Sequence, residues 1–340
     1  MSIKVLIIDD SATVRNVLAR ELARDPGIRV LGAAADPFAA REMMMLEQPD
    51  VITLDLEMPR MDGMTFLGKL MAHRPMPVIV VSSLTPQGSR MALDALDAGA
   101  LEVLAKPGVS YGVGELVPQL LARIKAVAGV RVFPRKAGPP QALPALSRTT
   151  NQIIALGAST GGTDALRQVI SALPADAPGM MVVQHMPPGF TAQFAARLAE
   201  VSRVRVSEAK DGDIVSPGIC LIAPGDRHLL VRRDGAMYRA VVRDGPKIGL
   251  HKPAVDVLFQ SMAQVAGANA IGALLTGMGR DGAAGLKAMR DAGASTIAQD
   301  EATCVVYGMP MEAVKLGAAE QILPIGAIAN RLLEIARLRT

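Results

Sequence analysis

The feature that most constrains the fold of this chain is a regular alternation between short apolar runs and amphipathic stretches. Within residues 1–125 five such runs occur, and each is followed by a segment whose apolar residues have helical spacing. They read KVLIID, IRVLGA, DVITLDL, PVIVVSS and LEVLAKP. Because runs that are apolar throughout are typical of parallel strands buried on both faces, the alternation predicts an open, doubly wound, five-stranded parallel sheet.

Residues 151–340 continue the alternation less regularly and predict a second, mainly parallel α/β domain. Two apolar runs, HLLVRRDG and MYRAVVRDG, lie so close together that a β-hairpin is expected there. Residues 126–150 are rich in Pro, Gly and basic residues and contain no acid. This composition favours a solvated linker over a nucleic-acid-binding patch, so we expect domains at 1–125 and 151–340 joined by a linker at 126–150.

Composition narrows the classes of function. Half of the 340 residues are hydrophobic, only 3% are aromatic and none is Trp, so stacking on nucleic-acid bases is not expected. A net charge of +4 does not by itself imply binding to DNA or to a membrane. Two cysteines, Cys220 and Cys304, are too few for a disulfide framework, and no run of about 18 apolar residues occurs. We therefore expect a cytoplasmic protein that neither inserts into a membrane nor binds nucleic acid.

Charged and polar residues end the predicted strands of the first domain. Asp9 and Asp10 end the first strand, Asp55 the third, Ser82 the fourth and Lys106 the fifth. The carboxyl ends of parallel strands meet at one edge of a sheet, so these side chains are expected to converge. Three converging carboxylates suit Mg²⁺, and a lysine supplies the charge that a phosphoryl group needs. Each acid alone is better explained as a helix cap, but the five together predict a site for Mg²⁺ and phosphate.

The stretch GASTG in the second domain places Ser159 between a predicted strand and a predicted helix. The spacing G-x-S-x-G is that of a turn that presents a nucleophilic serine beside unpaired helix N–H groups. A phosphate-binding loop and a simple capping serine are the alternatives, although the stretch has neither the G-x-G-x-x-G spacing nor the lysine of a Walker loop. The pattern alone leaves the nucleophile and the cap about equally supported.

A nucleophilic serine needs a base, and His185 is the best candidate among four histidines. One predicted strand ends just before Ser159, and the next predicted strand ends at His185. Consecutive strands of such a sheet are usually neighbours. His228 and His251 are further candidates for a base or a substrate contact, whereas His73 lies in a loop of the first domain.

The stretch LLTGMGRDGA offers the remaining groups that such a serine requires. Asp281 could orient the imidazole and stabilise its charged form, or it could only cap the following helix. The glycines around Met278 allow an unusual backbone path with exposed N–H groups. Such N–H groups could form an oxyanion hole, and Met278 is the candidate donor.

The motifs IIDDSATVR, LDLEMPRMDG, VSS and AKP resemble the receiver domain of two-component response regulators, over essentially all of residues 1–125. The resemblance implies that Asp55 is the phosphorylated residue. It implies a Mg²⁺ site made with Asp55 by Asp9, Asp10 and the backbone carbonyl of Glu57. By the same resemblance, Ser82 is the switch hydroxyl and Lys106 contacts the acyl phosphate.

The motifs GASTGG, QHMPPGFT, IAPGDRHLL and LLTGMGRDGA resemble the catalytic domain of the chemotaxis protein-glutamate methylesterases. That family also has an N-terminal receiver domain and a linker. The resemblance implies a hydrolase with Ser159 as nucleophile, His185 as general base and acid, Asp281 as orienting acid and Met278 as oxyanion donor.

The resemblance also implies a substrate and partners. The substrates are γ-glutamyl methyl esters on chemotaxis receptors, together with receptor glutamines that would be deamidated. The phosphodonor is a chemotaxis histidine kinase. No metal is implied for ester hydrolysis, and Mg²⁺ serves only the receiver domain. Our hypothesis for the two domains is that the unphosphorylated receiver blocks the Ser159 cleft and that phosphorylation at Asp55 loosens this contact. A phosphorylation-switched binding module without catalysis is the main alternative. A transcription factor is a weaker one, because no helix-turn-helix pattern is found.

Overall fold

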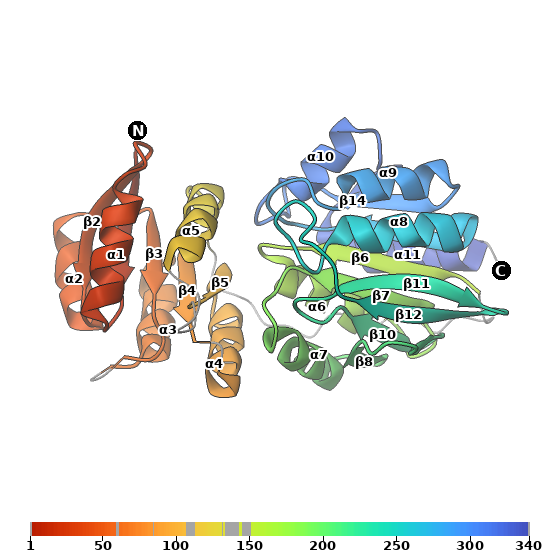
Figure 1. The fold of residues 1–340 in the computed structure, drawn as a ribbon, viewed down its shortest axis with the longest axis horizontal. Coiled ribbons are helices and arrows are strands. Elements are labelled where there is room, and N and C mark those ends of the chain that lie inside the picture. Colours follow the sequence, from red (N-terminus) through yellow and green to blue (C-terminus); the bar gives the residue numbers. More distant parts are fainter. Residues whose placement is uncertain are drawn as a thin grey trace. The chain divides into compact units, whose positions relative to one another are not determined.

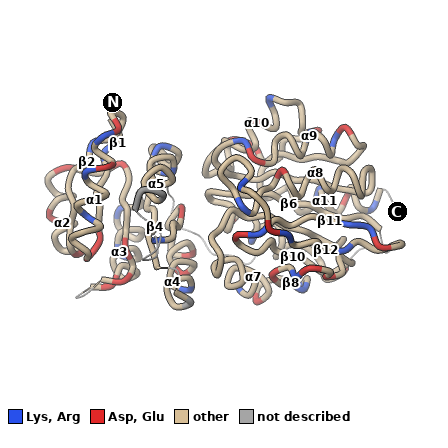
Figure 2. Tube along the Cα trace, viewed as in Figure 1, with Lys and Arg blue, Asp and Glu red and all other residues tan. Residues whose placement is uncertain are grey.

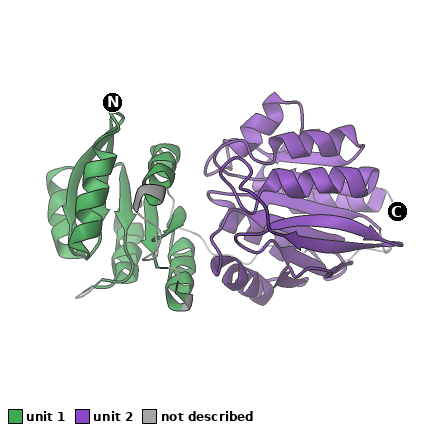
Figure 3. Cartoon of the chain, in the orientation of Figure 1, with its two compact units in different colours: residues 1–137 green, residues 138–340 purple. Residues whose placement is uncertain are grey.

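The chain forms two compact units, residues 1–137 and 138–340 (Figure 3). The computed structural model describes residues 2–58, 61–83, 85–106, 113–130, 132, 143–144 and 151–338. The boundary between the units falls within the predicted linker at 126–150. Most of that stretch lies outside the described residues, so the linker and the domain limits stay predictions.

The first unit is a five-stranded parallel sheet with the strand order β2-β1-β3-β4-β5 (Figure 1). Strands and helices alternate throughout, as the apolar runs predict. The elements are β1 (Ile3–Ile8), α1 (Ala12–Leu22), β2 (Ile28–Ala34), α2 (Pro37–Leu46), β3 (Val51–Leu54), α3 (Gly63–His73), β4 (Val78–Ser82), α4 (Pro86–Asp97), β5 (Glu102–Ala105) and α5 (Val113–Val127).

Local chemistry explains why the helices of this unit begin where they do. The side chains of Ser11, Asp36, Asp62 and Thr85 each accept a hydrogen bond from a backbone N–H in the first turn of α1, α2, α3 and α4. Such caps satisfy N–H groups that have no partner within the helix. Apolar residues of α1 and α5 then pack on one face of the sheet and form its core.

The second unit contains a seven-stranded parallel sheet with the order β15-β14-β13-β6-β7-β10-β8. Its strands are β6 (Ile153–Ala158), β7 (Gly179–Gln184), β8 (Arg205–Glu208), β10 (Ile219–Ile222), β13 (Ala270–Leu274), β14 (Ser295–Gln299) and β15 (Gln321–Leu323). Its helices are α6 (Gly162–Ala172), α7 (Phe190–Val201), α8 (Val255–Val265), η1 (Gly267–Asn269), α9 (Ala283–Asp291), α10 (Met309–Lys315) and α11 (Ile325–Leu338).

The order of the strands places β6 at the centre of this sheet. After β6 the chain first builds one half through β7, β8 and β10, and it later returns to build the other half from β13 to β15. The strand order therefore reverses beside β6. In open α/β sheets, ligands bind at such a reversal, outside the carboxyl ends of the strands.

A small antiparallel sheet accompanies the large one. The predicted hairpin is present as β11 (His228–Asp234) and β12 (Met237–Arg243), and β9 (Ile214–Val215) pairs with β12 as the third strand. The fold class predicted from the sequence is thus confirmed for both units. The strand β9 and the helix α10 were not predicted, because two and seven residues are too short for a clear periodicity.

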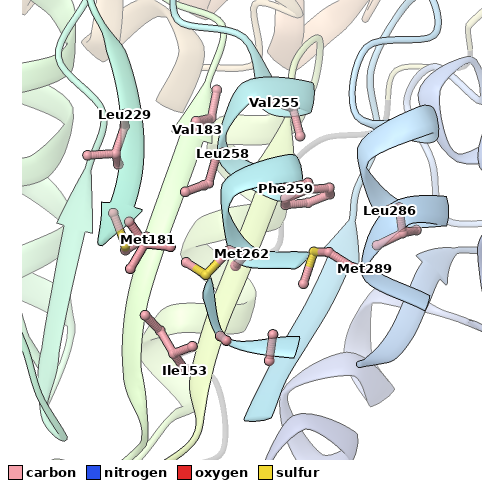
Figure 4. Close-up of a cluster of buried hydrophobic side chains, with 14 of the residues drawn as sticks. Ile153, Met181, Val183, Leu229, Val255, Leu258, Phe259, Met262, Leu286 and Met289 are labelled. Atoms are coloured by element: carbon pink, nitrogen blue, oxygen red, sulfur yellow. The ribbon is translucent and has the colours of Figure 1, made fainter. Parts of the chain in front are cut away.

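The main core of the second unit lies between the large sheet, α8, α9 and the small sheet. Figure 4 shows Val255, Leu258, Phe259 and Met262 of α8 pointing toward the strands and toward α9. In Figure 1, α8 and α9 lie side by side in front of the sheet, whereas α6 and α11 lie behind it. Because α8 packs on so much apolar surface, its N-terminus is held firmly above the carboxyl edge of the sheet.

Acidic and basic residues are interspersed along both units (Figure 2). Among the described residues, no helix combines the length and the apolar character that a membrane-spanning segment requires.

Candidate functional site

Ser159 lies directly after β6, where the chain turns into α6. It is buried, and its backbone is held on two sides: its N–H donates to the carbonyl of Thr276 (3.0 Å), and its carbonyl accepts from the N–H of Gly162 (2.7 Å). The turn is made by Gly161, whose φ of +75° lies in the left-handed region. Ser159 stays outside that region, since Asp226 is the one described non-glycine residue with positive φ. The glycine pattern therefore turns the chain without straining the serine.

His185 follows β7, and the register of the strands brings it beside Ser159. In the parallel pair β6–β7, Ala158 is the partner of Gln184, so Ser159 and His185 are the next residues on the two strands. The N–H of His185 donates to the carbonyl of Ala158 (3.2 Å), and the side-chain amide of Gln184 donates to the carbonyl of Ser159 (2.9 Å). Within the described part of the chain the Ser159 hydroxyl makes no hydrogen bond.

The imidazole of His185 forms a hydrogen bond with Asp281 through Nε2, the ring nitrogen farther from the backbone. Nε2 lies 2.7 Å from Oδ2 of Asp281, and both side chains are buried. Nδ1 is buried and has no hydrogen-bond partner among the described residues. Nδ1 is therefore the ring nitrogen that is left available to take a proton. In the familiar serine protease arrangement the two nitrogens have the opposite assignment.

Asp281 does not cap the helix that follows it. Its carboxylate instead accepts from the N–H groups of Val255 (2.7 Å) and Asp256 (3.0 Å), at the N-terminus of α8. Ala254, the N-cap residue of α8, has no side-chain oxygen that could accept these hydrogen bonds. In return, Oδ1 of Asp256 accepts from the N–H of Gly285 (2.6 Å) in the first turn of α9. The N–H groups at the start of α8 thus donate to the acid that precedes α9, and an N–H group in the first turn of α9 donates to an acid of α8.

These contacts set the charge of the two acids. Burial acts to raise the pKa of Asp281, but the hydrogen bond and charge of His185 and the N–H groups of α8 outweigh it, so the pKa lies below its ordinary value. Burial raises the pKa of Asp256, and the nearby charge of Asp281 adds to the effect. Of the two acids, Asp281 is therefore the one whose pKa is lowered, and it is the one that contacts the imidazole.

The loop between β13 and α9 is tied to the segment around Ser159. Thr276 is its anchor: its hydroxyl donates to the carbonyl of Thr160 (3.0 Å) and accepts from the N–H of Val306 (3.0 Å). Its N–H donates to the side chain of Gln299 (2.8 Å). The N–H of Met278, two residues on, makes no hydrogen bond to another described residue. The loop therefore presents a free backbone donor close to Ser159.

His251 is a residue of the site that the sequence named only as a possible contact. Its ring lies flat on the ring of His185, with centroids 3.7 Å apart and planes 6° apart. Neither spacing nor charge pattern indicates such a stack, because the two histidines lie on separate segments that meet only in the fold.

The two other histidines, His228 and His73, have different surroundings. His228 is buried, with Nε2 at 2.9 Å from the carbonyl of Pro246 and Nδ1 accepting from the N–H of Ala254 (3.3 Å). It therefore joins two segments of backbone and is not placed as a base for Ser159. His73 ends α3 in the first unit and is exposed.

The acidic cluster of the first unit forms as predicted. Asp9, Asp10 and Asp55 can each offer a carboxylate oxygen to a common point, and these atoms lie within 4.8 Å of one another. Asp9 and Asp55 are buried and Asp10 is exposed. Nζ of Lys106 lies 3.0 Å from Asp9 and 2.7 Å from Asp55. Three carboxylate oxygens, one of them from an exposed residue, fit the preferences of Mg²⁺.

Electrostatics at this cluster follow from burial. Burial raises the pKa of Asp55 above its ordinary value, although Lys106 acts in the opposite direction and Asp9 adds to the rise. Burial acts to lower the pKa of Lys106, but its bonds to Asp55 and Asp9 outweigh this and raise it. A divalent cation would relieve the repulsion that remains among the three acids.

Two further predicted residues surround the cluster. The hydroxyl of Ser82 is buried and donates to the carbonyl of Gly88 (3.3 Å). The N–H of Glu57 donates to Oδ1 of Asp55 (3.2 Å), and the Glu57 carboxylate accepts from the hydroxyl of Ser83 (3.2 Å). The carbonyl of Glu57 as a metal ligand and the switching role of Ser82 stay predictions.

Comparison with known proteins gives similarities over both units. Residues 154–332 match the family model "CheB methylesterase", and residues 5–111 match "Response regulator receiver domain". A protein-glutamate methylesterase/protein-glutamine glutaminase of Anaeromyxobacter dehalogenans is 58% identical over 98% of this chain and 95% of its own length. One from Pseudomonas aeruginosa is 52% identical over 100% of this chain and 98% of its own. The crystal structure of the Thermotoga maritima CheB methylesterase catalytic domain is 40% identical, with a TM-score of 0.53 over 54% of this chain and 98% of that one.

Gly277 offers a test of how tightly the loop packs on Ser159. A Cβ at this position would lie 2.8 Å from Cβ and 3.1 Å from N of Ser159, and 2.3 Å from the sulfur of Met309. We expect Gly277→Ala to lower the melting temperature of the second unit by several degrees, since overpacking costs about 1–3 kcal/mol. Thermal unfolding followed by circular dichroism measures it. Gly326→Ala, whose Cβ meets nothing within 4 Å, is the control. Equal melting temperatures for the two variants would contradict the close packing.

The lowered pKa of Asp281 predicts how the free energy of unfolding changes with pH. A carboxyl whose pKa is depressed by folding stabilises the fold above its unfolded value, about 3.9, and loses this contribution as the pH falls through the folded value. We expect Asp281→Asn to cost about 1–2 kcal/mol at pH 7 and progressively less below about pH 4. Urea unfolding at several pH values measures the difference. Asp291→Asn, at an exposed pair with Lys287, should be nearly neutral at every pH. If Asp281→Asn lowered the free energy of unfolding equally at every pH, Asp281 would not be ionised in the folded protein.

Proposed function

Because the chain belongs to the family of CheB methylesterases that carry a receiver domain, we propose that it hydrolyses γ-glutamyl methyl esters on chemotaxis receptors and deamidates receptor glutamines. The family assignment rests on matches that cover both units and on relatives that are 50–58% identical over nearly the whole chain. The observation that carries the chemistry is the bond between His185 and Asp281 beside Ser159.

In the first half of the reaction, Oγ of Ser159 attacks the carbonyl carbon of the ester and gives its proton to Nδ1 of His185. The negative oxygen that forms accepts a hydrogen bond from the free N–H of Met278. Such a donor is worth about a hundred- to a thousandfold in rate. The carboxylate of Asp281 holds the ring through Nε2 and stabilises its positive charge.

In the second half, the bond between the former carbonyl carbon and the methoxy oxygen breaks, and His185 gives its proton to that oxygen so that methanol leaves. A water molecule then attacks the acyl-enzyme and gives its proton to His185. Ser159 departs with that proton, and the glutamate carboxylate is released. With a glutamine side chain the same steps release ammonia in place of methanol.

The acidic cluster supports a switch. An oxygen of Asp55 attacks the phosphorus of a phosphodonor, which we propose to be a chemotaxis histidine kinase, and an acyl phosphate forms as the donor group leaves. Bound through Asp9, Asp10 and Asp55, Mg²⁺ would neutralise the phosphoryl oxygens. Lys106 lies within reach of Asp55 to pair with the phosphoryl group. Phosphorylation then relieves inhibition of hydrolysis at Ser159.

A binding module without catalysis is the main alternative. It would need neither an ionised acid behind the histidine nor a free N–H donor beside the serine. Both are present in the second unit, and they favour the hydrolase.

Release of labelled methanol from methylated receptors tests the proposal. We expect Ser159→Ala to abolish release while the far-ultraviolet circular dichroism stays unchanged, because the nucleophile is lost and the turn is kept. Ser207→Ala, at an exposed serine of the edge strand β8, is the control. Turnover that persists in the Ser159 variant would show that another residue attacks the ester.

The switch is tested through Asp55. We expect a small phosphodonor with Mg²⁺ to stimulate methanol release by the unaltered protein, and we expect removal of Mg²⁺ with a chelator to prevent this. Asp55→Asn should remove the stimulation. Asp50→Asn, at an exposed acid that accepts from the N–H of Lys4, should leave it intact. Stimulation that survives in Asp55→Asn would place the phosphorylated residue elsewhere.

A further inference from the structure

The turn that follows β12 exposes apolar side chains next to the candidate active site. Residues 246–250, which read Pro-Lys-Ile-Gly-Leu, are all exposed, and we call them the 246–250 turn. Ile248 is 41% exposed and Leu250 is 81% exposed. A single exposed leucine is ordinary on a protein surface. Two apolar side chains on one ordered turn beside an active site are a different matter, because exposed apolar clusters mark contact surfaces.

The backbone of the turn is closed on itself. Ile248 and His251 exchange two hydrogen bonds between their backbone N–H and carbonyl groups, both 3.0 Å long. Gly249 takes the first of the two positions between them with a φ of +64°, which is the conformation that favours glycine. Leu250 takes the second position. The side chain of Leu250 is therefore presented to solvent by an ordered two-residue turn.

The base of the turn is also anchored. Nζ of Lys252 lies 3.0 Å from an oxygen of Asp226 and 3.0 Å from one of Asp244, which links the two sides of the segment. Buried His228 holds the carbonyl of Pro246 (2.9 Å). These contacts fix both ends of the turn.

The turn is joined to the reacting groups through His251. This residue directly follows Leu250, and its ring is stacked on that of His185 at 3.7 Å. The 246–250 turn therefore adjoins the imidazole that serves Ser159 in the proposed mechanism.

We propose that the 246–250 turn is a docking surface for the apolar face of the substrate helix, with Leu250 and Ile248 as the residues that contact it. The inference rests on the proposed function, since it takes the substrate to be a glutamyl side chain on a receptor helix. On a helix, residues three or four positions apart lie on the same side. An apolar side chain one turn away from the modified glutamate would reach Leu250 and be buried there. A substrate that offers only a small ester would not.

Two cations suit the same partner. Lys247 within the turn and Arg280, two residues after Met278, are exposed, and neither forms an ion pair in the described part of the chain. Acidic residues that flank the modified glutamate would be attracted to them. The surface therefore fits an amphipathic segment that carries both apolar and acidic side chains.

The test compares two substrates on the full-length protein with a small phosphodonor and Mg²⁺. One is a methylated receptor in membranes, and the other is the γ-methyl ester of N-acetylglutamate amide. We expect Leu250→Ala to lower the ratio of kcat/KM for the receptor to kcat/KM for the small ester by about five- to tenfold. Ile248→Ala should lower it further when combined. Leu250→Gln, which keeps the size of the side chain, separates loss of apolar contact from loss of volume and should lower the ratio as well.

Leu338→Ala is the matched control, because Leu338 is 77% exposed but ends α11, which begins at the carboxyl edge of the sheet and runs away from it. Its ratio should not change. If Leu250→Ala leaves this ratio unchanged, whether kcat/KM is kept or falls equally for both substrates, the docking surface is wrong and the proposed function stands. If the unaltered protein hydrolysed the small ester but not the receptor, the proposed function and the docking surface would both be wrong.

Discussion

The carboxylate of Asp281 is the contact on which the geometry of the second unit's site depends. It accepts hydrogen bonds from the imidazole of His185 and from two N–H groups at the start of α8. The helix packs its apolar face into the core, so its N-terminus is fixed, and the acid is fixed with it. The positive end of the helix dipole also keeps the carboxylate charged despite its burial. One buried acid therefore connects the core of the domain to the ring that would move the proton.

The exchange of carboxylates between α8 and α9 extends this coupling. Asp256 supports the N-terminus of α9 while Asp281 supports that of α8, so neither helix can shift along its axis without disturbing the other. On the opposite side of Ser159, the contacts of Thr276 join the loop of Met278 to the segments around Thr160 and Val306. The serine thus lies between two rigid supports, and its own hydroxyl is left without a competing partner.

The sequence alone predicts much of this arrangement, and the rest depends on contacts that have no local pattern. Long apolar runs set the strands of both sheets, and strand order then brings Ser159 next to His185. The two-residue strand β9 and the short helix α10 carry too few residues for a period to emerge. The stack of His251 on His185 could not be predicted, because it joins separate segments. The choice of Nε2 for the acid could not be predicted either, since it depends on where the N-terminus of α8 lies. A pattern names the residue types at a site, but tertiary packing decides which atom faces which.

Both candidate sites lie at the carboxyl edge of a parallel sheet, yet they use charge in opposite ways. In the first unit three carboxylates gather with one lysine, and repulsion is left over that a divalent cation and a phosphoryl group can satisfy together. In the second unit the carboxylate of Asp281 is balanced by one imidazole and a helix N-terminus, and its neighbour Asp256 is held by the N-terminus of α9. The first arrangement would gain further stability when a cation and a phosphoryl group bind, which suits a switch. The second stays preorganised through every step of a reaction, and it needs to accommodate only the brief negative charge on the substrate oxygen. The same sheet edge can therefore serve regulation in one unit and hydrolysis in the other, because the groups that balance the acids placed there differ.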